Sequence, residues 1–277
     1  VPDGAVAVTG GTAVVTGTGA PLGDSTGGVP GGAVVVTDAA ARADDSPARR
    51  LVDEVAEDLD DTELAWLTRA VGLDAVAWQE QFGVARDVSG LTAERNVLRY
   101  LPVPVLIRWE SGPLAHLLRV LAAGLRAGGP LTLSTPEPLA AEVLDFLVES
   151  GAPVDVQVET TSAFHARARQ LAQLPPSAEG SGDPRVRMVL DWGASPAGGD
   201  ADAAGTVEIG GEVAAEQSRA AVLALHEAVD GSPDLAVYAG PVVSAGDVEL
   251  LPFLHEQAIS ITAHRFGTPD HLTDDLL

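Results

Sequence analysis

Two side chains that enzymes use for covalent catalysis are missing from this sequence of 277 residues. There is no Cys, which excludes thiolate nucleophiles, disulfides and Cys-ligated zinc. All sixteen basic residues are Arg, so a Schiff-base lysine, a lysine general base and a phosphate-loop lysine are excluded as well. The remaining candidates for chemistry are glycine-rich turns, histidines and carboxylates.

A glycine-rich turn near the N-terminus has the residue types of a nucleotide-binding loop. It runs from Val14 to Gly23 as VVTGTGAPLG. Neither GxGxxG nor TGxxxGxG fits its spacing, and Pro21 lies where the following helix should begin. A low-complexity linker explains these residues better than a phosphate site.

The six histidines do not match a known metal or catalytic pattern. His255, His264 and His271 lie near the C-terminus without the spacing of two zinc ligands one helical turn apart. The other three are isolated on predicted helices, where we expect surface or hydrogen-bonded positions: His116, His165 and His226. We therefore predict no metal site.

The charge of the chain disfavours two classes of partner. Its formal net charge is −24, and no basic cluster is longer than Arg49-Arg50. Binding to nucleic acid or to an anionic membrane depends on cationic side chains, so both are disfavoured. No apolar run approaches the roughly 20 residues that span a bilayer, and no signal peptide is recognisable. We expect a cytoplasmic protein without membrane insertion.

The first 95 residues divide into a linker and a helical part. Residues 1–45 are mostly Gly, Ala, Val, Thr and Asp, which bury little apolar surface and predict a flexible linker with one or two weak strands. Residues 46–95 predict a helical hairpin or connector. Its first helix begins at Ser46-Pro47, and others are expected after Asp61 and Asp74. Two of the four Trp lie there, so it must dock on the domain that follows or on a part of the protein outside this sequence.

Residues 96–277 alternate between strands and helices. The stretch from Val97 to Trp109 predicts a strand with an edge or bend at Pro102 and Pro104. Further strands are predicted at 131–134, 154–158, 186–190 and 235–238, with flexible inserts at 174–184 and 194–205. Such alternation implies right-handed crossovers. The predicted fold class is α/β, with a Rossmann-like open, mostly parallel sheet flanked by helices.

Local signals predict where three of these helices begin. One starts near Pro113 and stops at Gly128-Gly129. Ser134 and Glu137 have the spacing of a capping box that opens the next helix, and Thr161 or Ser162 should cap the third. The residues that the second helix should bury are Leu139, Val143, Leu144, Leu147 and Val148.

The segment from Leu121 to Val158, LAAGLRAGGPLTLSTPEPLAAEVLDFLVESGAPVDVQV, resembles the cofactor-binding half of an aldehyde dehydrogenase. Two more segments, WQEQFGVARDVSGLTAERNVLRYLPVP (78–104) and LLPFLHEQAISITAHRFGT (250–268), are similar to the C-terminal region of actinobacterial-type bifunctional proline-utilisation enzymes. These enzymes join a FAD-dependent proline dehydrogenase to a NAD-dependent glutamate-semialdehyde dehydrogenase. The longer members end in a degenerate aldehyde-dehydrogenase-like domain. The resemblance covers about residues 50–270.

The resemblance implies that a cofactor site has been lost. In the family, the lysine of a Lys-Pro-Ser-Glu motif contacts the adenosine ribose of the cofactor. Here Ser134 aligns with that lysine, and Glu137 is the last residue of the corresponding four. Gly193 lies near the place of the family's Phe-Thr-Gly-Ser turn. Residues 208–211, Glu-Ile-Gly-Gly, resemble the motif of the general-base glutamate, but Glu208 has no Cys to activate, and an ordinary turn is the alternative. We predict no catalytic residue and no cofactor in this segment; FAD and NAD belong to the parent enzyme.

The C-terminal segment 250–268 is the predicted contact surface. Its alternating apolar and polar residues suit an extended segment that adds to a sheet edge or covers a neighbouring domain. A last strand of its own sheet is the alternative. In the resembling enzymes this motif packs against the dehydrogenase domain and helps to enclose the path of the semialdehyde. The predicted contact residues are Phe253, Glu256, Gln257, Ile259, Ile261, His264, Arg265 and Phe266.

The sequence thus predicts a non-catalytic C-terminal domain of a bifunctional proline-catabolic enzyme, which serves as lid and assembly element and supports channelling. Its partner would be the catalytic aldehyde dehydrogenase domain of the same polypeptide, and a homo-oligomer is compatible with this role. The chain begins at Val1 and its only Met is Met188, as expected of a fragment, although a non-standard start codon or trimming would give the same beginning. Two alternatives stay open: an independent NAD(P)-binding oxidoreductase and a stand-alone acidic binding module.

Overall fold

The structure is a computed structural model that describes most of the chain. The described residues are 6–9, 12–15, 45–87, 89–91, 94–149, 153–174, 184–193, 209–262, 264–265 and 268–269. In the predicted linker, β1 (Val6–Thr9) and β2 (Thr12–Val15) form an antiparallel pair. Most of the remaining linker, most of the glycine-rich turn and most of the two inserts lie outside the described residues.

A five-stranded parallel sheet forms the centre of the molecule. Its order is β7-β6-β5-β8-β9, so the third strand of the sheet along the chain lies at one edge and the fifth at the other. This is the order of a doubly wound fold, in which the first crossovers cover one face and the later ones the opposite face. The strands are β5 (Val105–Trp109), β6 (Leu131–Thr135), β7 (Val154–Val158), β8 (Arg185–Val189) and β9 (Ala236–Tyr238). The predicted α/β class with a parallel sheet flanked by helices is confirmed.

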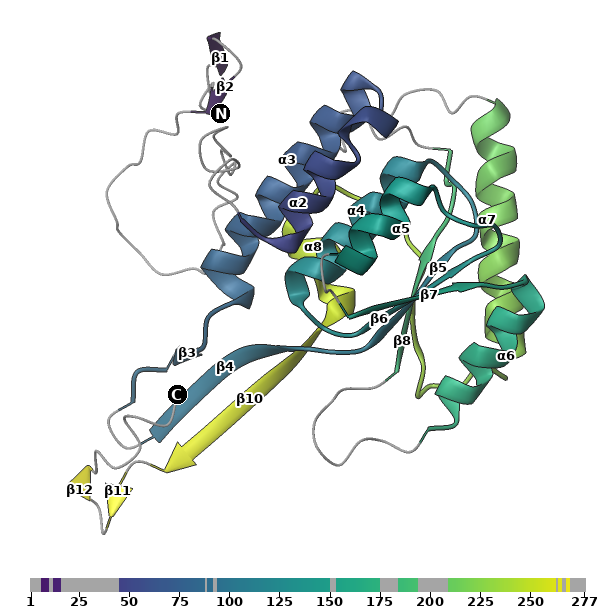
Figure 1. The fold of residues 1–277 in the computed structure, drawn as a ribbon. Coiled ribbons are helices and arrows are strands. Elements are labelled where there is room, and N and C mark those ends of the chain that lie inside the picture. The colour runs from purple at the N-terminus through teal and green to yellow at the C-terminus, as the bar shows by residue number, and fades with distance from the viewer. Residues whose placement is uncertain are drawn as a thin grey trace.

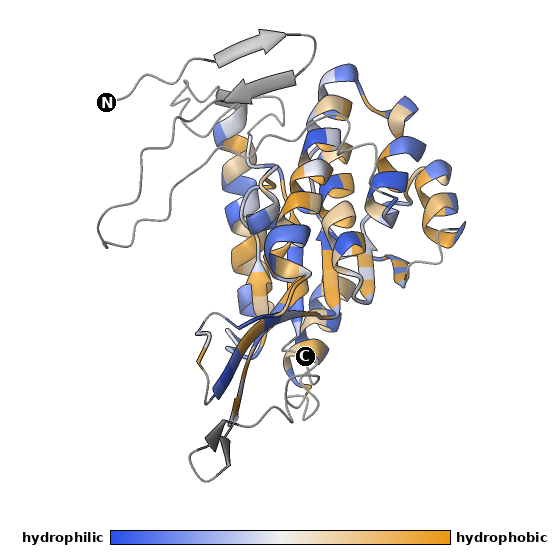
Figure 2. Ribbon diagram, turned by 90° about the vertical axis from the view of Figure 1, so that its left-hand side faces the viewer, coloured by the Kyte–Doolittle hydropathy of each residue, from blue (hydrophilic) through white to orange (hydrophobic). Residues whose placement is uncertain are grey.

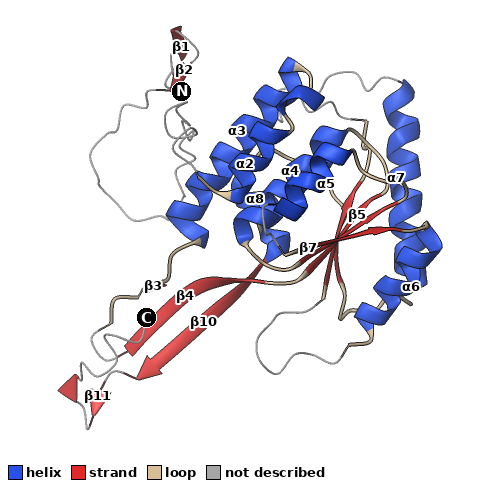
Figure 3. Cartoon of the chain, viewed as in Figure 1, coloured by secondary structure: helices blue, strands red, loops and turns tan. Residues whose placement is uncertain are grey.

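Helices cover both faces of this sheet (Figures 1 and 3). The helices α4 (Leu114–Ala127) and α5 (Ala141–Glu149) share a core with Ile107 of β5, whereas α6 (Thr161–Ala172) and α7 (Ile209–Ala228) share a second core with Leu106. Neighbouring residues of β5 thus point to opposite faces, as the alternation of a strand requires. No helix among the described residues is long and apolar enough to cross a bilayer.

The connector before the sheet packs on α4. It consists of α2 (Pro47–Glu54), the 3-10 turn η1 (Ala56–Asp58), α3 (Asp61–Ala77) and the π-helical turn η2 (Trp78–Phe82). Ser46 caps α2 by accepting the Arg49 amide, as predicted. A separate helix after Asp74 was a wrong prediction, because Asp74 is buried inside α3. Leu51 and Leu67 belong to the same core as α4, which answers what the connector docks on.

Some of the predicted helix boundaries are confirmed and others are wrong. Helix α4 begins after Pro113 and ends at Gly128, which adopts φ 80°, as predicted. Helix α6 is capped by Thr160 rather than by Thr161 or Ser162, since its hydroxyl accepts the Ala163 amide. Helix α7 begins at Ile209, so Gly210-Gly211 lies in a helical turn. Val148, predicted to be buried in α5, is 80% exposed.

A separate antiparallel sheet projects from this body. It pairs β10 (Leu254–Thr262) with β4 (Glu94–Pro102) along nine residues, and β3 (Arg86–Asp87) pairs with the other side of β4. We call β4 and β10 the arm (Figure 1). The bend predicted at Pro102 and Pro104 is where the chain leaves the arm and enters β5. Two further short strands, β11 (His264–Arg265) and β12 (Thr268–Pro269), pair with each other.

The base of the arm is held in the body by a short helical segment. Helix α8 (Gly246–Glu249) and the 3-10 turn η3 (Leu251–Phe253) lead directly into β10. The Val103 amide donates to the carbonyl of Phe253 at 3.0 Å, and the Phe253 side chain is 1% exposed in the main core. The arm therefore starts from a buried base.

Candidate functional site

The carboxyl ends of the parallel strands are the place where a doubly wound fold binds its ligand. In this chain the loops that follow β5 and β8 meet there. The amide of Glu110 donates to the carbonyl of Val189 at 3.1 Å, and the amide of Asp191 donates to the Ser111 hydroxyl at 3.1 Å. We call the residues at the ends of β5, β6 and β8 and at the start of α6 the crevice.

Arg108 fills the crevice from inside. This residue of β5 is fully buried, and its Nη1 donates to the Ser134 hydroxyl at 2.9 Å and to the carbonyl of Glu159 at 3.1 Å. Its Nη2 donates to the Thr161 hydroxyl at 3.2 Å, and its Nε to Glu110 Oε2 at 2.6 Å. A buried guanidinium needs such partners, because an unpaired buried charge is strongly destabilising.

An aromatic ring completes the environment of Arg108. Its guanidinium carbon lies 5.1 Å from the centre of the Phe164 ring, within the range of a cation–π contact. Since Phe164 is buried on α6, the Arg108 side chain links β5 to α6 through apolar as well as polar contacts. The sequence signal for this residue was a single charge inside the apolar strand VLIRW, which the sequence analysis missed.

Ser134 therefore has a different role from the predicted cap. It lies at the end of β6, fully buried, and α5 begins only at Ala141. Glu137 is exposed, and its carbonyl accepts the Thr135 hydroxyl at 2.7 Å. The capping-box prediction was wrong, because the crevice rather than the helix holds the serine side chain.

A carboxylate lies in the turn between β5 and α4, where a doubly wound fold places the phosphates of a dinucleotide. Glu110, which is bonded to Arg108, also accepts the Thr161 hydroxyl at 3.0 Å. Nearby, burial raises the pKa of Glu159, but the hydrogen bonds from Arg167 and Ser134 and the charges of Arg167 and Arg108 together outweigh it and hold this pKa below its ordinary value. The lowered pKa keeps the Glu159 carboxylate anionic at neutral pH, so its charge opposes a bound pyrophosphate.

Gly193 lies where the loop after β8 packs closely against the first turn of α7. It adopts φ 73°, and its amide donates to Asp191 Oδ1 at 2.8 Å. A Cβ at this position would lie 2.4 Å from the Cα of Gly211, in the first turn of α7. A glycine at position 193 is thus needed for the loop after β8 to approach the first turn of α7 here. Glu208 lies outside the described residues.

The histidines are not gathered into a site. His116 is 5% exposed, which contradicts the surface prediction, and its Nδ1 has no hydrogen-bond partner among the described residues. Burial lowers the pKa of this imidazole. Within the described part of the chain, no group of three His, Asp or Glu residues could hold a metal ion.

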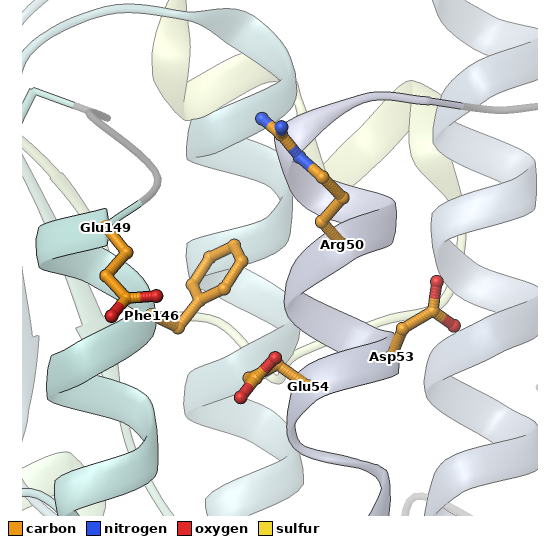
Figure 4. A pocket seen from close by; sticks show the side chains of 5 residues that line it. All are labelled: Arg50, Asp53, Glu54, Phe146 and Glu149. Atoms are coloured by element: carbon orange, nitrogen blue, oxygen red, sulfur yellow. The ribbon is translucent and has the colours of Figure 1, made fainter.

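A depression of about 320 Å³ lies between α2 and α5 (Figure 4). Phe146 lies at its centre, with the Glu149 carboxylate to one side and Arg50 above (Figure 4). Most of the lining is exposed, and Asp53 is paired with Arg49 at 2.5 Å. Its lining residues are Arg50, Asp53, Glu54, Phe146 and Glu149.

The predicted contact residues of the tail divide between the body and the arm. Phe253 is buried in the body, so its side chain is not available to a partner. In the arm, Glu256 accepts the Tyr100 hydroxyl at 3.2 Å, and Gln257 accepts Arg99 Nε at 2.7 Å. Ile259 and Ile261 are half-buried. His264 and Arg265 lie in β11, and Phe266 is outside the described residues.

No family model and no curated protein matches the chain. Among solved structures, it is similar to proline utilization A (PutA) from Corynebacterium freiburgense, with 27% identity, a TM-score of 0.40, and coverage of 73% of this chain and 14% of that chain. A second PutA, from Bdellovibrio bacteriovorus and inactivated by N-propargylglycine, is 12% identical with a TM-score of 0.36, covering 53% of this chain and 16% of the other. A proposed aldehyde dehydrogenase from Bacillus subtilis subsp. subtilis str. 168 is 11% identical with a TM-score of 0.39, covering 74% and 42%.

The chain therefore spans less than half the length of each of these solved structures. Since every TM-score lies below 0.5, these likenesses do not assign the chain to a family.

Proposed function

We propose that this chain is a non-catalytic, aldehyde-dehydrogenase-like domain at the C-terminal end of a bifunctional proline-catabolic enzyme. The parent enzyme would convert proline to glutamate through glutamate semialdehyde, with FAD and NAD bound to its catalytic domains. This chain would act as a lid and assembly element that supports channelling of the semialdehyde. The proposal starts from the sequence resemblance of residues 78–104 and 250–268.

The observation that carries the non-catalytic part is the filled crevice. Arg108 occupies the space between β5, β6 and α6 with four hydrogen-bonding partners. Ser134, the residue in the place of the family's lysine, is fully buried beneath this guanidinium. A cofactor that entered here would have to separate the fully buried guanidinium from its partners, and an unpaired buried charge costs several kcal/mol by order of magnitude.

The lid part of the proposal rests on the arm. In the sheet order β10-β4-β3, β10 is an edge strand and pairs only with β4 among the described strands. An edge strand presents backbone N–H and C=O groups that another strand can pair with. Opposed residues share a face, so Ile259 with Val97 and Ile261 with Arg95 form one face of the arm (Figure 2 shows the hydropathy along it).

Calorimetric titrations and an activity assay test the non-catalytic part. The purified chain should give no heat of binding with NAD or NADP and should not reduce NAD in the presence of glutamate semialdehyde. Micromolar affinity would instead favour an independent NAD(P)-binding oxidoreductase. The reading frame upstream of Val1 should encode a dehydrogenase with a catalytic cysteine; a start codon at that point would favour a stand-alone acidic binding module.

The lid part is tested in the parent enzyme with a matched pair of substitutions. Ile259→Asp places a charge on the half-buried face of the arm, and Ser260→Asp places one on the exposed face. We expect Ile259→Asp to lower the coupled proline-to-glutamate flux more than either half-reaction, and Ser260→Asp to leave all three rates close to wild type. Equal losses in all three assays would contradict a channelling role.

A further inference from the structure

Arg119 of α4 joins the connector to the base of the arm. Its side chain is fully buried, and Nη1 and Nη2 each donate to a different oxygen of Asp74 in α3, both at 2.7 Å. Its Nε donates to the carbonyl of Val243 at 3.0 Å, in the segment just before α8. The planar fork of an arginine can bind a carboxylate with two donors and still offer Nε to a third group.

The contacts continue from Val243 into the sheet. The amide of Val243 donates to Glu249 Oε2 at 3.1 Å, and Arg187 Nε donates to Glu249 Oε1 at 2.7 Å. Arg187 lies on β8 and also donates to the carbonyl of Gly240 at 3.0 Å. This buried series of contacts, which we call the relay, runs from α3 through α4 and α8 to β8.

The backbone of α8 also lies directly against α3. A Cβ on Gly246 would be 2.7 Å from the carbonyl oxygen of Leu73 and 2.8 Å from the amide of Asp74. Because α8 is followed at once by η3 and β10, a shift of α8 away from α3 would turn the base of the arm. The base of the arm is also held by Arg185 of β8, whose Nη1 donates to the carbonyls of Leu251, Pro252 and Leu254.

A buried ion pair is a poor way to gain stability alone, since apolar residues of similar volume are often as stabilising. The relay instead fixes the relative position of three segments. The bidentate pair holds α4 to α3, and the bond from Arg119 to the carbonyl of Val243 holds the segment before α8 to α4. We propose that Arg119 is a positioning residue, which sets the direction of the arm relative to α3 by holding Val243 and α8 in place. This rests on the proposed function, in which the arm meets the catalytic domain.

Spin-label distances in the full chain test this, and the absence of Cys makes the labelling specific. One label pair joins the arm to α3 through Ser260→Cys and Thr62→Cys. A second pair joins α3 to α6 through Thr62→Cys and Ala166→Cys and reports on the body alone; all three positions are exposed. In the Arg119→Met background we expect the first distance distribution to shift and broaden and the second to stay unchanged.

Two other variants make the test decisive. Gly246→Ala forces α8 from α3 without changing any charge and should shift the arm distance in the same way. Arg219→Met removes an exposed pair with Glu216 and should change neither distance. An unchanged arm distance in both Arg119→Met and Gly246→Ala would overturn the proposal, as would equal broadening of both label pairs. Because no catalytic partner is needed, this result is independent of whether the arm docks on one.

Discussion

The polar groups of the crevice and of the arm differ in whether they have partners inside the described part of the molecule. In the crevice, the fully buried guanidinium of Arg108 donates hydrogen bonds to Glu110, Ser134 and Thr161. The Thr161 hydroxyl in turn donates to Glu110. In the arm, β10 leaves one edge without a strand neighbour among the described residues, and its side chains are at most half-buried beyond Leu254. The place where this fold usually binds a ligand is thus internally satisfied, while a projecting edge is available for contact.

The largest effect in either region should come from the relay that links the arm to the body. Arg119→Met leaves the Asp74 carboxylate buried without its cation, which should lower the free energy of unfolding by about 3–5 kcal/mol. Urea unfolding followed by circular dichroism measures this. Arg219→Met, at an exposed pair, should change it by less than about 0.5 kcal/mol. Similar losses of unfolding free energy in the two variants would mean that the relay contributes no more to stability than an exposed ion pair.

The loss in Arg119→Met should depend on pH. In the wild type, burial raises the pKa of Asp74 from 3.8 to about 6, even though Arg119 lowers it. Without Arg119 this pKa rises further. A carboxyl with a raised folded-state pKa contributes stability below its unfolded pKa and loses that contribution as the pH rises through the folded value. The deficit should therefore grow as the pH increases above about 6, and a constant deficit from pH 5 to 8 would argue against this coupling.

An intermediate effect is expected in the crevice. Arg108→Ala leaves the buried Ser134 hydroxyl without its donor and removes the contact with Phe164, which should cost about 2–3 kcal/mol of unfolding free energy. The label distance between the arm and α3 should not change. If this variant moved the arm as Arg119→Met is expected to, the two regions would not be separable.

A smaller effect should come from Gly193→Ala, at the edge of the crevice. The left-handed conformation costs an alanine about 1 kcal/mol, and the clash with Gly211 adds to it. Gly231→Ala is the matched control, since it has φ 61° and nothing within 4 Å of the added Cβ. Thermal unfolding should show a larger decrease in Tm for Gly193→Ala, and equal decreases would mean that the approach of β8 to α7 does not require glycine.

The smallest change in stability is expected in the arm. Ile259→Asp should alter the free energy of unfolding of the isolated chain by less than about 1 kcal/mol, because the residue is only half-buried. Its effect should appear in the parent enzyme as lost coupled flux. A loss of several kcal/mol in the isolated chain would instead mean that the arm is part of the folded core.

The elements that could be predicted from sequence are those with a strong local pattern. Pro113, the leucines that follow and Gly128 determine α4, and the two prolines near Val103 mark the exit from the arm. A new helix was expected after Asp74 and a capping box at Ser134, yet Asp74 binds an arginine 45 residues away and Ser134 one 26 residues away. Local rules fail at these sites because a distant charge needs a buried partner, and one sequence does not reveal such pairs.

The pairing of β10 with β4 also fixes an order of events during synthesis. Tyr100 and Glu256, which bond across the arm, are 156 positions apart in the chain. Contacts of such long sequence separation form late, after the loop between them has been closed by other structure. On the ribosome, β4 would therefore emerge with β3 beside it but without β10 while all five strands of the central sheet are made. The arm can therefore form only after translation has passed β10, when every strand of the central sheet has already been made.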